Sequence, residues 1–188
     1  MSISNIWVFA QITDGAASSA TLELLTKANS LGGTVTAFVA GSAGDGAAAF
    51  ADHGAAKIYE TGDLAGALPG AAVSAAMKSV IDGGDSPDLV MFPQNYEGRD
   101  VMSRLSVKLD RTVLTNSTDV AVDGDSVSVI TPIFGGAKLV TSTFTGEAPH
   151  LAAFRPKSFE PAGGAGGAGD VVAAPVPDLG ATGGASVT

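Results

Sequence analysis

Short apolar runs alternate with amphipathic stretches over the first two thirds of the chain. The apolar runs are rich in β-branched and aromatic residues and predict strands buried on both faces, at residues 5–12, 34–40, 57–59, 89–92 and 113–115. Between them, apolar residues recur with helical spacing and predict helices over residues 18–31, 47–53, 69–81 and 97–109. This alternation is typical of a mostly parallel sheet with helices on both faces, so we predict an α/β fold.

Capping residues and polar pairs mark the helix boundaries. Ser18 or Ser19 can cap the first helix, and the glycines at 32–33 can end it in a left-handed conformation. Pro69 suits the first turn of the third helix. In the fourth helix, Asp100 and Arg104 are four residues apart, which predicts an ion pair on the outer side.

The pattern changes after Asn116. Residues 119–122, 126–134, 138–145 and 150–154 are strand-like, and turn residues at 123–125 and 135–136 separate the first three of these segments. Because the segments follow one another closely, we expect all of them to pair antiparallel. The predicted fold therefore ends in an antiparallel hairpin region.

The composition shifts again at Pro161. Residues 162–169 contain only Gly and Ala, which is typical of a flexible linker. We therefore predict one domain over residues 1–160 and a Gly/Ala-rich linker or tail over residues 161–188. Residues 171–176 can add one extended segment to this tail, and Gly183 and Gly184 loosen its end.

Composition and charge exclude several classes of function. The 188 residues include no cysteine, so disulfide frameworks, iron–sulfur ligands and thiol nucleophiles are excluded. A formal net charge of −9 argues against binding to nucleic acid or anionic membranes. No apolar run is long enough for membrane insertion, and the N-terminal residues do not resemble a signal peptide, so we expect a cytoplasmic protein. His53 and His150 occur in different motifs and have no metal-ligand spacing, so we predict neither a metal site nor catalytic residues.

The glycine-rich loop after the second predicted strand is a weak candidate for cofactor binding. Gly41, Gly44 and Gly46 precede a helix, and their backbone amides can meet an anion there. Asp45 would repel a phosphate and no lysine is near in sequence, so a flexible connecting loop is the other interpretation.

A second candidate region follows the fourth strand, at the sheet edge where ligands and partners bind in open α/β folds. Four of the ten Lys and Arg residues of the chain lie between positions 99 and 111. A cationic cluster on an acidic protein predicts a local partner surface, although a solvated helix face balanced by Asp100 and Asp110 is the alternative. The partner-interface candidates are Gln94, Asn95, Tyr96, Glu97 and Arg99.

An ordered set of segments over residues 5–160 resembles the N-terminal domain of the electron transfer flavoprotein alpha subunit (the FixB type). Residues 21–28 resemble the family's first helix, and residues 97–110 its fourth helix. Residues 132–137, Pro-Ile-Phe-Gly-Gly-Ala, resemble its hairpin, and residues 154–159, Phe-Arg-Pro-Lys-Ser-Phe, its exit strand. The resemblance implies a Rossmann-like sheet akin to adenine-nucleotide-binding and universal-stress-type domains.

The resemblance also implies partners and a cofactor. The expected partner is the family's beta subunit, in a heterodimer that carries electrons through FAD. Donors would be flavin dehydrogenases such as the acyl-CoA dehydrogenases of fatty acid oxidation, and the acceptor a quinone oxidoreductase. The chain would then be an electron carrier subunit and not an enzyme.

The family's flavin-binding motifs do not occur in this sequence, so no FAD contact is carried over onto its residues. We expect this chain to bind no cofactor alone and the FAD domain to be a separate chain, truncated away or lost. A stand-alone nucleotide-binding module of the universal-stress type, using the loop at residues 41–46, is the alternative, and a small flavodoxin-like carrier is a third hypothesis.

Overall fold

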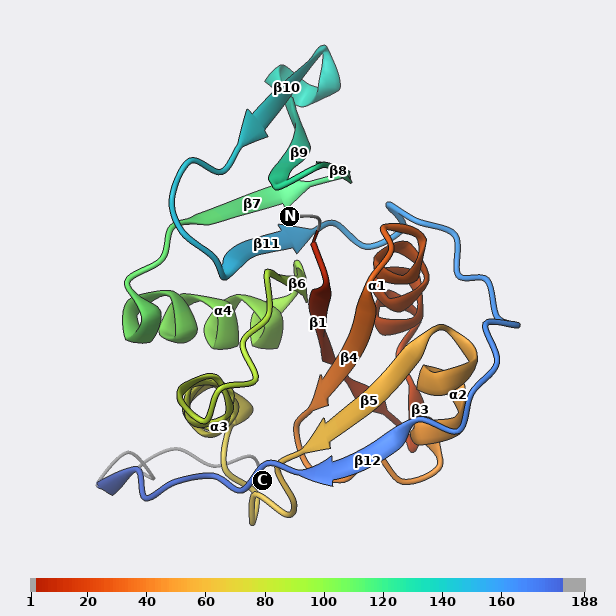
Figure 1. Cartoon of the computed structure of the whole chain (residues 1–188), viewed down its shortest axis with the longest axis vertical. Coiled ribbons are helices and arrows are strands. Elements are labelled where there is room, and N and C mark those ends of the chain that lie inside the picture. The colour runs from red at the N-terminus through yellow and green to blue at the C-terminus, as the bar shows by residue number, and fades with distance from the viewer. Residues whose placement is uncertain (1–2, 181–188) are drawn as a thin grey trace.

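The central feature of the molecule is a parallel sheet. The computed structural model describes residues 3–180, and within this range the sheet has seven strands in the order β12-β5-β4-β1-β6-β11-β7 (Figure 1). In chain order these strands are β1 (Asn5–Ala10), β4 (Thr34–Val39), β5 (Ala55–Glu60), β6 (Leu89–Pro93), β7 (Val113–Ser117), β11 (His150–Phe154) and β12 (Asp170–Ala173). The predicted α/β, Rossmann-like architecture is confirmed.

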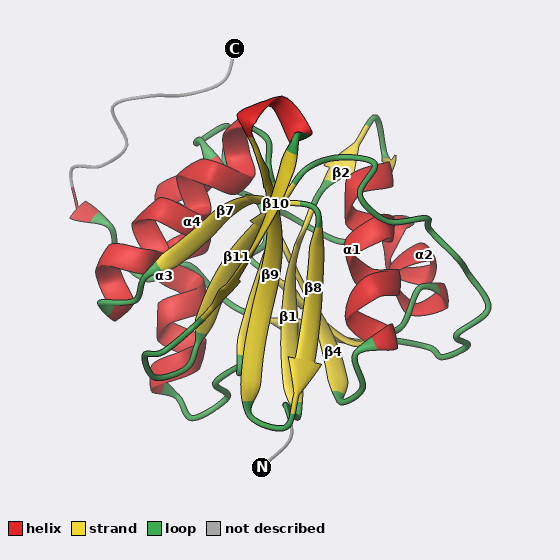
Figure 2. Ribbon diagram, turned by 90° about the horizontal axis from the view of Figure 1, so that it is seen from above, coloured by secondary structure: helices red, strands yellow, loops and turns green. Residues whose placement is uncertain are grey.

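Helices cover both faces of this sheet (Figure 2). The helices α1 (Ser19–Ser30) and α2 (Gly46–Asp52) lie on one face, and α3 (Pro69–Asp82) and α4 (Tyr96–Leu109) lie on the other. Each face has its own apolar core. Alternate residues of β1 supply both, since Ile6 and Val8 pack toward α1 while Trp7 and Phe9 pack toward α3 and α4.

The helix boundaries follow the capping residues of the sequence. The Ser18 hydroxyl accepts a hydrogen bond from the Thr21 N–H at 3.2 Å, so Ser18 is the residue that caps α1. The chain leaves this helix through Gly32, whose φ is 84°. In α4 the predicted pair forms, with Arg104 Nε 2.8 Å from Asp100 Oδ1.

A smaller antiparallel sheet lies beside the main one. It consists of β8 (Asp119–Asp123), β9 (Ser126–Ile133) and β10 (Lys138–Thr143), and a 3-10 turn, η1 (Phe134–Gly136), joins β9 to β10. Val120, Val127 and Val129 anchor it in the core on the α1 side. The hairpin of β9, η1 and β10 is called here the β9–β10 arm (residues 126–143). Its far end projects beyond the main sheet (Figure 1). A further short hairpin joins β2 (Ile12–Thr13) to β3 (Ala16–Ala17).

One prediction about strand pairing is wrong. The closeness of residues 150–154 to the hairpin strands predicts antiparallel pairing, but β11 lies parallel between β6 and β7. Burial explains the difference. Leu151 and Ala153 pack into the α4-side core, whereas Ala152 and Phe154 pack into the α1-side core. A strand that is apolar on both faces is stable only inside the sheet, where neither face meets water.

The segment predicted to be a linker contacts the domain along its length. The Ala162 N–H donates to Thr26 Oγ1 at 3.1 Å, and the Gly164 N–H donates to Asp52 Oδ1 at 3.0 Å. The chain then enters β12, which pairs parallel with β5, so an extended segment does form in this region. The domain boundary at residue 160 stays a prediction, and Gly183 and Gly184 lie outside the described residues.

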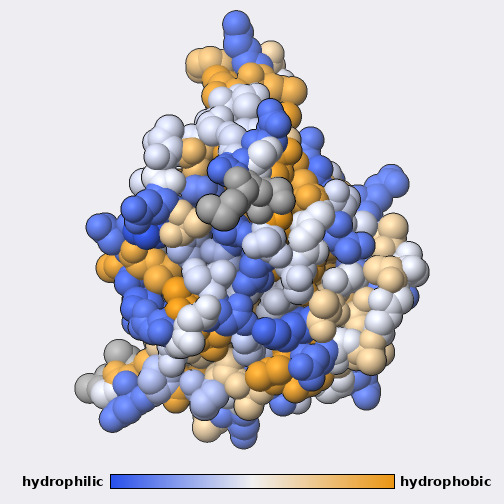
Figure 3. All heavy atoms as spheres, viewed as in Figure 1, coloured by the Kyte–Doolittle hydropathy of each residue, from blue (hydrophilic) through white to orange (hydrophobic). Residues whose placement is uncertain are grey.

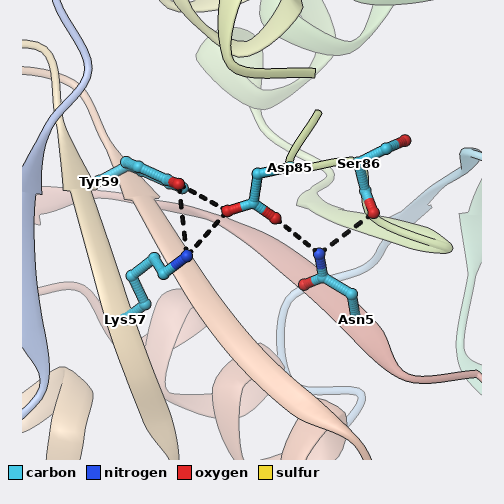
Figure 4. A network of polar contacts seen from close by, with 5 residues as sticks. All are labelled: Asn5, Lys57, Tyr59, Asp85 and Ser86. Atoms are coloured by element: carbon cyan, nitrogen blue, oxygen red, sulfur yellow. Dashed lines mark hydrogen bonds and ion pairs between the residues drawn. The ribbon is translucent and has the colours of Figure 1, made fainter. Parts of the chain in front are cut away.

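A polar network ties the amino end of β1 to β5 and to the loop before β6 (Figure 4). Asp85 Oδ2 accepts hydrogen bonds from Lys57 Nζ at 2.8 Å and from the Tyr59 hydroxyl at 2.5 Å. Asn5 Nδ2 donates to Asp85 Oδ1 at 3.0 Å and to the Ser86 carbonyl at 3.1 Å. Partial burial disfavours the charged carboxylate, but the hydrogen bonds from Lys57, Tyr59 and Asn5 outweigh it and hold the pKa of Asp85 below its ordinary value.

The network predicts how stability depends on acid. Because the pKa of Asp85 is lowered by folding, its contribution is present above the ordinary aspartate pKa and is lost as pH falls through the lowered value. We expect Asp85→Asn to reduce the free energy of unfolding by about 1–2 kcal/mol at pH 7. The difference from the parent protein should shrink toward pH 2 in urea titrations. Asp82→Asn, which removes the more exposed pair with Lys78, is the matched control and should change stability little at either pH.

Gly98 permits the close approach of α4 to the end of β6. A Cβ atom at Gly98 would lie 2.0 Å from the Pro93 carbonyl oxygen, and that backbone cannot move without disturbing the sheet. We expect Gly98→Ala to destabilise the fold by about 1–3 kcal/mol through overpacking. Gly146→Ala, at a position with open space around it, is the control. Equal thermal unfolding midpoints for both variants would contradict this account.

Candidate functional site

The order of the strands creates a cleft at the carboxyl ends of β1 and β4. The chain builds β4 and β5 on one side of β1 and then resumes with β6 on the other side. Loops diverge at such a reversal and leave room for a ligand. A cavity of about 510 Å³ lies here, called the switch-point cavity, and it is lined by Gln11, Ile12, Ala40, Gly41, Ser42, Asp63, Leu64, Gly66, Ala67, Pro69 and Glu97.

Gln11 connects β1 to the start of α4 on one wall of this cavity. Its backbone N–H donates to Thr21 Oγ1 at 2.8 Å, which fixes the turn out of β1. Its side-chain oxygen accepts from Asn95 Nδ2 at 2.6 Å, and its side-chain nitrogen donates to Glu97 Oε2 at 2.5 Å. Asn95 also caps α4, because its Oδ1 accepts from the Gly98 N–H at 2.9 Å. One amide side chain thus couples two elements that are distant in sequence.

The glycine-rich loop forms the opposite wall only in part. Gly41 lines the cavity, and its N–H donates to Thr61 Oγ1 at 2.8 Å. Gly44 and Gly46 do not line it. Gly46 instead packs against Ile12, where an added Cβ would lie 2.3 Å from Ile12 Cδ1. The structure therefore brings Gly41 and Glu97, two candidates from different parts of the sequence, to one cavity.

The charge of the lining defines what this cavity can hold. Asp63 and Glu97 are both acidic, and among residues 3–180 no lysine or arginine belongs to the lining. The two carboxylates accept hydrogen bonds, Asp63 from the Ala65 N–H at 2.8 Å and Glu97 from Gln11. Such a site favours neutral or cationic groups with hydrogen-bond donors and disfavours phosphate, because like charges repel at short range. This weighs against the alternative of a stand-alone nucleotide-binding module.

The five partner-interface candidates divide into two groups. Gln94, Asn95 and Glu97 form hydrogen bonds within the molecule, since Gln94 Oε1 accepts from the Asn116 N–H at 3.2 Å and the other two bond Gln11, although Glu97 is exposed. Tyr96 is 86% exposed, and the Arg99 guanidinium lies 5.2 Å from the centre of its ring. Contact of any of these residues with a partner stays a prediction, but Tyr96, Glu97 and Arg99 have the exposure that it requires.

Sequence reasoning missed part of this polar layer. Gln11 directly follows β1, and Thr21 lies in the first turn of α1. Gln11 had a usable signal, because it directly follows an apolar strand. Asn116 and Arg155 had none. Arg155 Nε donates to Asn116 Oδ1 at 2.7 Å although 39 residues separate the two in sequence, and only the insertion of β11 beside β7 brings them together.

Neither histidine belongs to a ligand set. His53 Nδ1 contacts the Ala49 carbonyl at 2.8 Å, and His150 stacks on Phe144 with 4.6 Å between ring centres. Burial lowers the pKa of His150, and nearby Arg111 lowers it further against the opposing effect of Asp88. Among the described residues, no group of three or more His, Cys, Asp or Glu side chains is placed to hold a metal ion. None of the helices in residues 3–180 is long and apolar enough to cross a bilayer.

Comparison with known proteins identifies the family. The model of the electron transfer flavoprotein domain matches residues 6–179, nearly the whole described range. This chain belongs to the electron transfer flavoprotein family. The resemblance of its helices, hairpin and exit strand to the alpha-subunit N-terminal domain is thereby confirmed.

Two curated relatives of the electron transfer flavoprotein family refine this assignment. The chain is 32% identical over 173 residues to the electron transfer flavoprotein subunit alpha of Syntrophomonas wolfei subsp. wolfei, a match covering 90% of this chain and 53% of the relative. It is 28% identical over 163 residues to Protein FixB of Clostridium saccharobutylicum, covering 82% of this chain and 48% of the relative. The chain therefore spans about half the length of the curated relatives it matches.

Asn95 both caps α4 and donates a hydrogen bond to the Gln11 side chain, and two variants can separate these roles. Asn95→Ala removes both the cap of α4 and the donor to Gln11, and should lower the free energy of unfolding by about 1–2 kcal/mol. Asn95→Asp keeps the cap oxygen but loses the amide donor, so it should retain most of the stability while removing one of the two hydrogen bonds of the Gln11 side chain, whose bond to Glu97 remains. Urea unfolding measures the first effect, and the NMR signals of the Gln11 side-chain amide report the second.

Ser103→Ala, on the exposed side of α4, is the control for helix propensity: it should raise the free energy of unfolding by at most about 0.5 kcal/mol and leave the Gln11 signals unchanged. A Gln11 amide that gives the same NMR signals in the parent protein and in Asn95→Asp would contradict the hydrogen bond between Asn95 and Gln11.

Proposed function

We propose that this chain acts as the N-terminal part of an electron transfer flavoprotein alpha subunit and supplies a docking scaffold for a beta subunit. FAD is held by the complete assembly. That assembly carries electrons from flavin dehydrogenases, such as the acyl-CoA dehydrogenases of fatty acid oxidation, to a quinone oxidoreductase or another acceptor. This chain contributes shape and contact surface to the carrier and no catalytic residue.

The observation that carries the proposal is the exposed, apolar β9–β10 arm. Phe134 is 79% exposed, Leu139 is 67% exposed and Val140 is 38% exposed, although all three are large apolar residues. Figure 3 shows apolar surface gathered where the arm projects from the molecule. Exposed apolar side chains gathered in this way mark sites of protein association in soluble proteins.

Strand β10 adds a second feature that suits a partner. It pairs with β9 on one side, and within residues 3–180 no strand pairs with its other side. An open strand edge presents unpaired N–H and C=O groups, and a strand of another chain can satisfy them. The arm therefore offers apolar contacts and backbone hydrogen bonds together, which supports a stable heterodimer.

The residues of the described part of the chain do not fit FAD by themselves. A flavin requires an apolar slot for its ring and converging donors for its pyrophosphate. The switch-point cavity instead exposes Asp63 and Glu97, whose carboxylates disfavour the pyrophosphate charge. This charge pattern supports the proposal that the cofactor belongs to the complete assembly.

The proposal is tested by reconstitution. The chain is mixed with a family beta subunit and with a polypeptide carrying the family's FAD domain, and association is followed by sedimentation velocity and flavin absorbance. We expect a complex that retains FAD and is reduced by an acyl-CoA dehydrogenase with its substrate. Leu139→Glu places a charge in the apolar interface and should weaken association by about tenfold or more.

Leu68→Glu, which introduces the same change at a position 46% exposed and remote from the arm in sequence, is the matched control and should leave association intact. The scaffold proposal fails if the chain remains a monomer in the presence of both proteins. It also fails if the chain alone retains stoichiometric FAD after gel filtration.

A further inference from the structure

The outer face of α4 is exposed, and its composition differs from that of the surrounding surface. This α4 face consists of Tyr96, Glu97, Arg99, Asp100, Ser103, Arg104, Val107 and Lys108. Tyr96 is 86% exposed and Val107 is 82% exposed, so an aromatic and an aliphatic residue stand in solvent near the two ends of the helix. Figure 3 shows apolar and hydrophilic atoms interleaved over this part of the surface.

Helical geometry places all of these residues except Glu97 on two adjacent rows. Positions 96, 100, 104 and 108 follow one row at intervals of four, and positions 99, 103 and 107 follow the next. The opposite side of α4 is committed to the core through Val101, Met102 and Leu105. The 14 residues of α4 span about 21 Å, so the face is as long as a typical helical docking surface.

The charge of the α4 face opposes that of the whole chain. Its three cations, Arg99, Arg104 and Lys108, outnumber its two anions, Glu97 and Asp100, whereas the formal net charge of the chain is −9. Arg104 is paired with Asp100, but within residues 3–180 neither Arg99 nor Lys108 forms an ion pair. An acidic partner is therefore repelled by most of this molecule and attracted where Arg99 and Lys108 retain their charge.

A groove lies beside the α4 face. The groove lies between α3 and α4, has a volume of about 570 Å³, and includes Arg104 and Lys108 in its wall. Its floor on α3 is made of small residues such as Ala71, Ser74 and Ala75. The ion pair of Lys78 with Asp82 also lines it, and the segment at Pro177–Leu179, which includes the acidic Asp178, borders it. A helix laid along α4 can therefore bury side chains in the groove as well as contact Tyr96 and Val107.

We propose that the α4 face is a docking site for an acidic helical segment of a partner protein. Apolar contact with Tyr96 and Val107 anchors the two ends of the segment, and its carboxylates meet Arg99 and Lys108 between and beside these anchors. Tyrosine and arginine are among the residues that contribute most to protein interfaces. This site is separate from the β9–β10 arm, since the arm is rooted in the core on the α1 side of the sheet.

The test uses the whole chain and a short synthetic amphipathic helix that carries glutamates beside a leucine stripe. NMR titration should shift the backbone signals of Tyr96, Arg99 and Val107 and of residues that line the groove, with an affinity that falls as salt rises. A peptide with glutamine in place of each glutamate is the control ligand and should bind about tenfold more weakly.

Two double variants distinguish the effect of charges on the α4 face from the effect of the net charge of the chain. Arg99→Glu with Lys108→Glu should weaken peptide binding by about tenfold or more. Lys138→Glu with Lys157→Glu makes the same change in net charge at exposed positions away from α4 and should weaken it less than about twofold. Tyr96→Ala should reduce affinity without changing its dependence on salt, and unfolding midpoints confirm that each variant is folded.

Several outcomes would overturn the docking site. These are equal losses in the two double variants, equal binding of the glutamine peptide, and signal changes that map to the arm or elsewhere. Self-association through α4 in the absence of peptide would identify a second copy of the chain as the occupant instead. Binding to vesicles of anionic phospholipid without binding to the peptide would assign the face to a membrane surface.

Discussion

The structure depends on burying both faces of one central strand. Residues 6–10 of β1 are fully buried, with even positions in the α1-side core and odd positions in the α3- and α4-side core. Parallel strands can be joined only by crossovers, which carry helices over the two faces of the sheet. Because β4 lies on one side of β1 and β6 lies on the other, the direction in which strands are added reverses at β1. The switch-point cavity opens at this reversal.

Polar contacts hold this frame at its two ends in different ways. At the amino end, Asp85 gathers Lys57, Tyr59 and Asn5 into an ionic network. At the carboxyl end, the Gln11 amide joins Asn95 to Glu97. The first network holds a loop against the sheet edge, whereas the second shapes the wall of a cavity. Phosphate groups often bind at this position in α/β folds. The acidic lining of this cavity disfavours them.

The two proposed docking sites are exposed surfaces on different parts of the molecule. Within residues 3–180, the β9–β10 arm presents Phe134 and Leu139 beside an open strand edge. In the same range the α4 face presents Tyr96 and Val107 beside Arg99 and Lys108, which form no ion pair there. The arm is rooted on the α1 side of the sheet and α4 packs on the other side, so one partner on each is sterically compatible with the other. Such a division would suit the proposed role of a docking scaffold.

The amino-acid sequence by itself determined the elements of this protein. Apolar periodicity and caps such as Ser18 act over a few residues, so the helices and most strands were predictable within a residue or two. Only the tertiary structure decided that β11 enters the parallel sheet, that β12 returns to β5, and that Arg155 meets Asn116. These pairings join segments far apart in sequence. They are selected by the burial of whole faces, and no local pattern records which face a distant segment will cover.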